Sequence, residues 1–135
     1  MANEVIAFAV RNTLTKGPQY KPVLIGQNIP FDIGFLQQMM AYAGLMTQFY
    51  GNFQPRYIDT LDLGHMAFAR DPSVGSYKLE LIAERLGVEL ADAHDADADV
   101  TATREVAALY AARLGCANGA AGTPQAEKTR THFKI

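Results

Sequence analysis

The feature that most constrains the fold is a short apolar run, Val-Leu-Ile at residues 23–25, bounded by a proline and a glycine. Its length and its β-branched ends predict a buried strand of a parallel sheet. Residues 31–46 then repeat apolar side chains at helical spacing, which predicts a helix directly after the strand. Asp32 therefore follows the carboxyl end of a strand, where open α/β sheets bind their ligands. We expect the chemistry of the chain at this point.

Length and composition limit the chain to one domain and to certain partners. The 135 residues are 49% hydrophobic, and 12 basic against 14 acidic side chains give a net charge of −2. No global field therefore attracts nucleic acid or an anionic membrane, so contact with a polyanion must be local or bridged by metal. Cys116 is the single cysteine, which excludes an internal disulfide framework and fits a reducing compartment. Without a membrane-length apolar run or a basic signal-peptide start, the chain is expected to be cytoplasmic, with no membrane contact.

Hydrophobic periodicity and turn residues predict the other elements. We expect helices at residues 3–14, 61–69, 77–86 and 96–114, a short strand at 57–58, and loops at 47–55 and 71–76. Asp59 and Thr60 are expected to cap the helix at 61–69, and Gly87 to stop the helix at 77–86. The inward face of the last helix is expected to carry Val100, Thr103, Val106, Ala107, Tyr110 and Leu114. Residues 1–115 form the predicted domain, and residues 116–135 a flexible C-terminal tail.

The helix at 96–114 begins with an acidic cluster that has two interpretations. In His94-Asp95-Ala96-Asp97-Ala98-Asp99, the helix dipole rewards early carboxylates by about 0.3–1 kcal/mol each. That reward alone accounts for Asp95 and Asp97, but less well for Asp99, which lies further into the helix. A histidine five residues before an aspartate is also a pattern for a general base beside a metal ligand. A plain solvated helix start is the other interpretation of the same residues.

Four blocks in chain order resemble the DEDDh (DnaQ-like) 3′–5′ exonucleases of the ribonuclease H-like superfamily, which include proofreading subunits of bacterial replicative polymerases. The resemblance extends over residues 23–110 and implies an α/β fold that is helix-rich, with about two short parallel strands. The matching residues are Asn28-x-x-Phe31-Asp32-x-x-Phe35-Leu36, Ile58-Asp59-Thr60-Leu61, Leu79-x-x-Ile82-Ala83-x-x-Leu86-Gly87 and His94-x-Ala96-x-x-Asp99-x-x-x-Thr103.

The resemblance implies a role for each matched site residue. Asp32 resembles the aspartate that helps hold the second metal and the scissile phosphate, and Asp99 resembles a direct ligand of the first metal. His94 resembles the general base that takes a proton from the attacking water. Two Mg²⁺ or Mn²⁺ ions about 3.5–4 Å apart stabilise both the attacking and the leaving oxygen of an in-line displacement, and carboxylates are the hard ligands these ions prefer. Asn28 and Phe31 resemble positions that shape the turn and the nucleotide pocket, whereas Phe35 is expected to be core.

One departure from the family pattern is serious. The first family motif, Asp-x-Glu on the first strand, supplies two metal ligands, yet residues 1–22 contain a single acid, Glu4. The chain therefore resembles a partial ribonuclease H-like domain whose first three strands are missing, and its two-metal site is incomplete. In the family sheet the first strand lies beside the strand at residues 23–26, so its loss opens an edge. We expect self-association there, or docking of a missing N-terminal segment.

Two functional hypotheses from different classes follow from this pattern. The first is a metal-dependent 3′–5′ exonuclease of proofreading or repair type that acts on a 3′ end, DNA more than RNA. In this hypothesis the further ligands come from outside the chain, and a polymerase is a candidate partner. The second is a non-catalytic remnant or interaction module that binds nucleic acid or a polymerase partner without cleavage. Retention of His94, Asp32 and Asp99 favours the first, and the missing first motif favours the second for this polypeptide alone.

Overall fold

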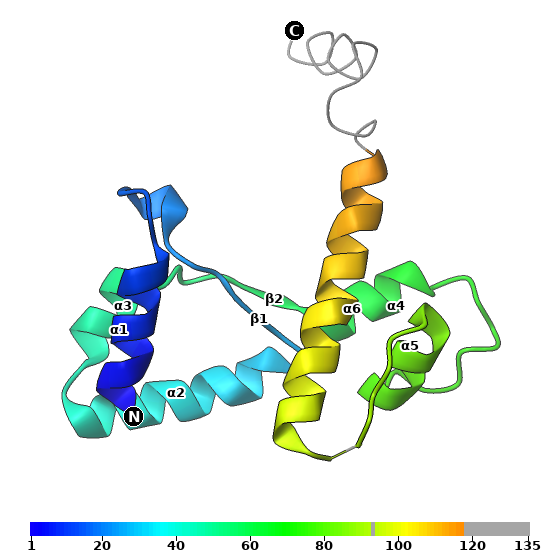
Figure 1. The fold of residues 1–135 in the computed structure, drawn as a ribbon, viewed down its shortest axis with the longest axis horizontal. Helices are drawn as coiled ribbons and strands as arrows, with labels where there is room; N and C mark the ends of the chain where they lie inside the picture. The colour runs from blue at the N-terminus through cyan, green and yellow to red at the C-terminus, as the bar shows by residue number, and fades with distance from the viewer. Residues whose placement is uncertain (93, 118–135) are drawn as a thin grey trace, which may run out of the picture. The chain divides into compact units, whose positions relative to one another are not determined.

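The computed structural model describes residues 1–92 and 94–117, and the chain divides into two compact units, Met1–Asp71 and Pro72–Ile135. In the part of the chain that is described, no helix is both long and apolar enough to cross a membrane. The first unit holds α1 (Ala2–Asn12), a 3-10 turn (Pro18–Tyr20), β1 (Leu24–Gly26), α2 (Ile29–Ala43), α3 (Met46–Asn52), β2 (Tyr57–Asp59) and α4 (Thr60–Ala67), and the second holds α5 (Leu79–Leu86) and α6 (Ala96–Ala117) (Figure 1).

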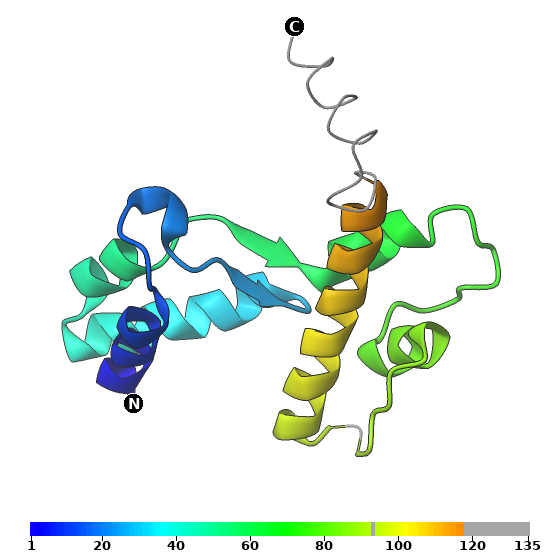
Figure 2. The same ribbon diagram turned by 45° about the horizontal axis from the view of Figure 1, so that its top comes forward.

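The sheet of the first unit consists of β1 and β2, which run parallel and side by side (Figure 2). Ile25 pairs with Ile58 and Gly26 pairs with Asp59. Gln54 extends this pairing backwards, because its backbone N–H donates to the carbonyl of Pro22 at 3.0 Å. The prediction of a helix-rich α/β fold with two short parallel strands is therefore confirmed.

The core of the first unit lies where α1, α2 and α3 pack together (Figure 1). α1 contributes the small side chains Ala2 and Ala9, seven residues apart, so the same face of the helix meets its neighbours closely. Met40 of α2 is completely buried, and the rings of Phe49 and Phe53 lie with centroids 5.2 Å apart. These five buried side chains form the hydrophobic core that packs the three helices together.

The expected loop at residues 47–55 is wrong, because most of it forms helix α3. Phe49 and Phe53 are four residues apart, and a helical turn is what brings both rings into the core. The preceding helix also ends earlier than residue 46. Gly44 adopts a left-handed conformation with φ of 70°, and the N–H of Leu45 donates to the carbonyl of Met40 at 2.8 Å. The N–H of Gly44 also donates to the carbonyl of Ala41 at 3.2 Å, and the two bonds together form a helix-stopping motif that favours glycine.

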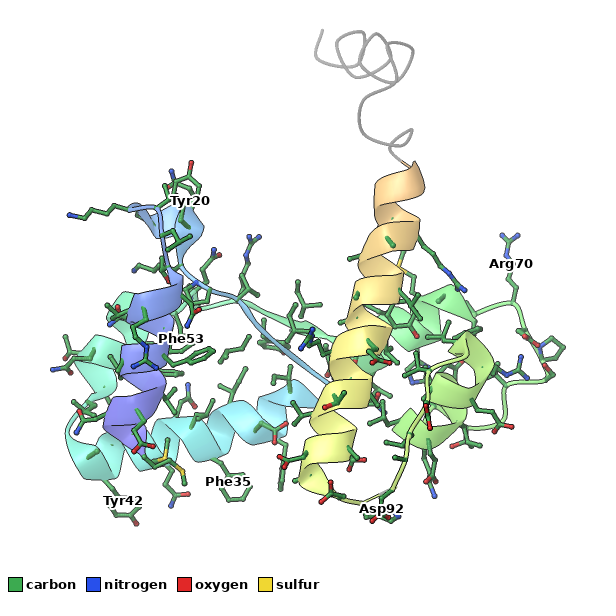
Figure 3. The ribbon with its side chains drawn as sticks, viewed as in Figure 1. Tyr20, Phe35, Tyr42, Phe53, Arg70 and Asp92 are labelled. Atoms are coloured by element: carbon green, nitrogen blue, oxygen red, sulfur yellow. The ribbon has the colours of Figure 1, made fainter. Side chains whose placement is uncertain are left out.

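Burial of the strand and of Phe35 was also predicted wrongly. Ile25 in β1 is 47% exposed and Phe35 in α2 is 60% exposed. Figure 3 shows Phe35 and Tyr42 projecting from the same side of α2, away from the packed helices. The reason lies in the size of the sheet, since a parallel sheet becomes buried only when helices cover both of its faces. Two strands of three residues, contacted by α2 and α4, do not reach that state.

In the second unit, α5 packs against α6. α5 stops at Gly87, as expected, where φ is 73° and the N–H of Val88 donates to the carbonyl of Ala83 at 2.8 Å. Val100 and Leu114 of α6 are 70% and 59% exposed, so their expected inward position is wrong. α6 has 22 residues against the 8 of α5, so α5 can cover only part of the longer helix. Among the described residues of this unit, the buried apolar side chains are Ile82, Ala83, Val88, Ala102, Val106 and Tyr110.

The predicted flexible tail at residues 116–135 lies almost entirely outside the described residues, which end at residue 117. The predicted domain at residues 1–115 stays a prediction beside the two compact units.

Candidate functional site

The predicted site residues of the first unit lie at the tight turn that joins β1 to α2. Gly26 ends the strand and is buried, and a Cβ atom added to it would lie 2.7 Å from Cδ1 of Ile29. Because Cδ1 is the end of a flexible side chain, a residue with a Cβ here would require Ile29 to move, whereas glycine lets Ile29 pack directly against the end of the strand. Asn28 then adopts a left-handed conformation with φ of 55° and ψ of 41°. Asparagine tolerates this region better than most residues, so the local sequence explains why the chain reverses here.

Asp59 connects this turn to the end of β2. Its Oδ1 accepts a hydrogen bond from the backbone N–H of Asn28 at 2.8 Å and another from the N–H of Leu61 at 3.0 Å. Its side chain is only 9% exposed. The bond to Leu61 is the helix cap expected from the sequence, whereas the bond to Asn28 was missed. The register that aligns Gly26 with Asp59 places this carboxylate beside the turn.

Phe31 and Asp32 stand in the first turn of α2 and are both exposed. The ring of Phe31 meets that of Phe35 edge to face, with centroids 5.0 Å apart. A carboxylate in the first turn of a helix is favoured by the backbone N–H groups that point towards it. The helix N-terminus therefore stabilises the negative charge of Asp32, and the exposed side chain can still reach a ligand. The aromatic face beside it suits contact with a flat apolar group such as a base.

The other predicted site residues lie at the start of α6, in the second unit. His94 is exposed and has a positive φ of 77°. Oδ2 of Asp95 accepts a hydrogen bond from the N–H of Ala98 at 3.1 Å, which is the geometry of a helix cap. Asp99 is half-buried one turn later, and its carbonyl accepts from the hydroxyl of Thr103 at 2.7 Å. Asp95 thus stabilises the start of α6 as its cap. Asp92, in the preceding turn, points outward (Figure 3).

The structure groups the predicted site residues within each unit. Asn28, Phe31 and Asp32 share one turn and its following helix in the first unit, and His94 and Asp99 share the start of α6 in the second. Across residues 1–92 and 94–117, no group of three or more His, Cys, Asp or Glu side chains could hold a metal ion. The donors within each unit therefore do not fit a complete two-metal centre, and we assign no reaction step to a metal.

Comparison with known proteins adds independent evidence on ancestry. The 3′-5′ exonuclease DinG of Staphylococcus aureus (strain bovine RF122 / ET3-1) is 32% identical over 88 residues, which are 64% of this chain and 9% of that protein. The DinG protein of strain USA300 is 31% identical over 88 residues with the same coverage. The chain thus spans 9% of the length of these curated relatives. No solved structure matches it.

The RNase_T family, described as exonuclease, matches residues 4–107, which is well over half of the 135 residues. The match includes the predicted site residues of each unit and both strands, and it implies a ribonuclease H-like fold. The resemblance inferred from the four sequence blocks is thereby confirmed: the chain belongs to the RNase_T family of DEDDh, or DnaQ-like, exonucleases.

Proposed function

We propose that this chain is the part of a metal-dependent 3′–5′ exonuclease that contributes Asp32, His94 and Asp99 to phosphodiester hydrolysis. The family match over residues 4–107 is the observation that carries the proposal. The exposure of Asp32 and His94 and the half-burial of Asp99 support it, because groups that meet a ligand must be reachable. Asn28 and Phe31 are proposed to shape the pocket for the terminal nucleotide.

The proposal places the Mg²⁺ or Mn²⁺ pair in a complete assembly rather than in this chain alone. Two such ions need several hard oxygen ligands, and the described residues bring no three suitable side chains together. We therefore propose that further carboxylates come from outside the chain. An upstream segment with an Asp-x-Glu strand and a partner polypeptide are the two candidate sources, and the activity test adds the first of them.

β1 offers a place for such a segment. In the described part of the chain its only strand partner is β2, so its second edge has no paired strand there. An open edge with exposed apolar side chains such as Ile25 favours strand addition. We propose that residues 23–26 either pair with a second copy or accept an N-terminal segment. Sedimentation at increasing protein concentration should show a mass above that of the monomer, and a constant monomer mass would exclude self-association.

The test of activity is Mn²⁺-dependent shortening of a single-stranded DNA oligonucleotide labelled at its 5′ end. The chain alone is expected to shorten it slowly or not at all, and addition of an upstream segment with Asp-x-Glu should produce a ladder of products shortened from the 3′ end. Asp99→Asn should abolish the ladder, whereas Asp97→Asn should leave it, because Asp97 is an exposed acid of the same helical turn. An RNA oligonucleotide of the same sequence tests the proposed preference for DNA.

The lack of an Asp-x-Glu motif in residues 1–22 favours a second candidate, a binding module without cleavage. Such a module would bind the oligonucleotide in the same experiment and leave its length unchanged, with or without the added segment. A polymerase subunit is the proposed protein partner in either case. Failure to cut and failure to bind together would count against both candidates.

A further inference from the structure

We propose that Asp59 is a positioning residue for the nucleotide site, because its carboxylate fixes the turn from which α2 presents Phe31 and Asp32. The inference rests on the proposed function only in taking these two side chains as groups that meet the substrate. The structural part stands on the contacts of Asp59 alone.

The first step is the conformation of Asn28. Its φ of 55° and ψ of 41° lie in the left-handed region, which costs energy in any residue with a Cβ atom. Such a conformation persists only where the surrounding structure enforces it. The side chain of Asn28 makes no capping bond to α2, so the enforcement comes through the backbone. The N–H of Asn28 donates to Oδ1 of Asp59 at 2.8 Å.

The second step is the rigidity of the acceptor. Asp59 is 9% exposed, and the same Oδ1 also accepts from Leu61 at 3.0 Å. Hydrogen bonds to an ionised carboxylate are about twice as strong as neutral ones. One oxygen atom thus joins the end of β1 to the start of α4 through two backbone donors. Side-chain motion at Asp59 would break both bonds at once.

The third step is the effect of the turn on the direction of α2. Asn28 is the residue before α2, and the N–H of Phe31 donates to its carbonyl at 3.2 Å. The direction of the first helical turn is therefore set by the peptide groups of Asn28. On the other side of the turn, the side chain of Ile29 packs directly against Gly26. A change at Asp59 should consequently move Phe31 and Asp32 without any direct contact to either.

The test separates this task from ordinary helix capping. Asp59→Ser keeps an oxygen that caps α4, but its shorter side chain should lose the bond to Asn28. Asp59→Asn keeps a carbonyl oxygen at the original position and should restore both bonds. Asp62→Ser is the matched control, since Asp62 lies in the first turn of α4 and is exposed.

Amide hydrogen exchange and NOE spectra of the full chain provide the readout. In Asp59→Ser, exchange at Asn28 should become about tenfold faster, and the strong intraresidue amide–Hα NOE of a positive φ should weaken. Exchange at Leu61 should stay as in the Asp62→Ser control. Asp59→Asn, whose neutral oxygen accepts weaker bonds from both amides, should protect Asn28 better than Asp59→Ser does. Unchanged protection of Asn28 in Asp59→Ser, or equal loss at Asn28 and Leu61, would overturn the proposal, and the wild-type NOE at Asn28 tests it even if the serine variant does not fold.

A single-stranded DNA oligonucleotide then tests the functional consequence. Resonances of Phe31 and Asp32 should shift on its addition to the wild type and to Asp59→Asn, and the dissociation constant should rise about tenfold in Asp59→Ser. Unaltered affinity in Asp59→Ser, with the turn released, would overturn the positioning role. Absence of any shift in all proteins, with the Asn28 results as expected, would instead count against the proposed function.

Discussion

The rings of Phe31 and Phe35 meet edge to face at an interplanar angle of 80°, although both side chains are more than half exposed. An aromatic pair of this geometry is worth roughly 0.5–1.5 kcal/mol beyond area burial. The pair therefore orders the outer face of α2 at its N-terminal end rather than contributing to the core of the first unit.

Replacement of Phe35 should affect stability only slightly. Phe35→Ala is expected to lower the free energy of unfolding by about 1 kcal/mol or less, because the side chain loses one ring contact and little burial. Phe49→Ala, at a position 4% exposed, should cost about 3–5 kcal/mol. Urea unfolding followed by circular dichroism measures both values. Similar losses for the two variants would show that the outer face of α2 is covered in solution.

Met40 should be the methionine on which the first unit depends most. It is completely buried between the helices, whereas Met66 of α4 is 78% exposed. Met40→Ala is therefore expected to cost about 2–5 kcal/mol through lost contacts and a cavity, and Met66→Ala less than about 0.5 kcal/mol. Thermal unfolding compares the two substitutions. A Met40→Ala protein that melts with the wild type would contradict the described core.

Thr60→Val should stabilise the chain. The hydroxyl of Thr60 is buried, and no hydrogen-bond partner for it lies in the described part of the chain. A buried hydroxyl without a partner costs about 1–3 kcal/mol, and valine has nearly the same shape without that group. We expect a gain of about 1 kcal/mol in urea unfolding. Thr101→Val on the exposed side of α6 is the control, and destabilisation by Thr60→Val would reveal a partner for the hydroxyl.

Tyr110 should make stability depend on alkaline pH. Burial raises the pKa of its phenol above 10.0, and the nearby Arg113 offsets part of that effect. With a higher pKa in the folded state, the unfolded chain loses this proton first, so the stabilisation present below about pH 10 is lost as the pH rises through the folded-state pKa. Unfolding free energies measured between about pH 9 and 11 should therefore fall less in Tyr110→Phe than in the wild type. Tyr42→Phe, at an 85% exposed position, should retain the wild-type slope.

Local signals in the sequence were sufficient for the elements that end or begin with a characteristic residue. Gly87 stops α5 and Asp59 caps α4 as expected, because each effect depends on a few neighbouring peptide groups. α3 was missed since Gly51 and Asn52 suggest a loop, although Phe49 and Phe53 already showed helical spacing. The exposure of Ile25 could not be predicted in the same way, because burial of a strand depends on how many layers cover it.

For the candidate site, too, the features carried by local sequence could be predicted, and those that depend on tertiary structure could not. The residues Asp32, His94 and Asp99 were identified from the four sequence blocks, and their proposed roles stay predictions. The bond between Asn28 and Asp59 could not be inferred, since it joins residues 31 positions apart and depends on the strand register. A capping pattern in the sequence indicates one acceptor bond for Asp59 but carries no information on a second donor from another strand.

The order in which β1 and β2 occur along the chain has a consequence for synthesis on the ribosome. β1 is synthesised before α2, α3 and β2, because translation adds residues from the N-terminus. Closing this long connection costs entropy that is recovered only when Ile25 meets Ile58. Until β2 has been synthesised, the apolar strand β1 of the nascent chain lacks this pairing partner. A chaperone that binds short extended apolar segments would be able to bind β1 during that interval.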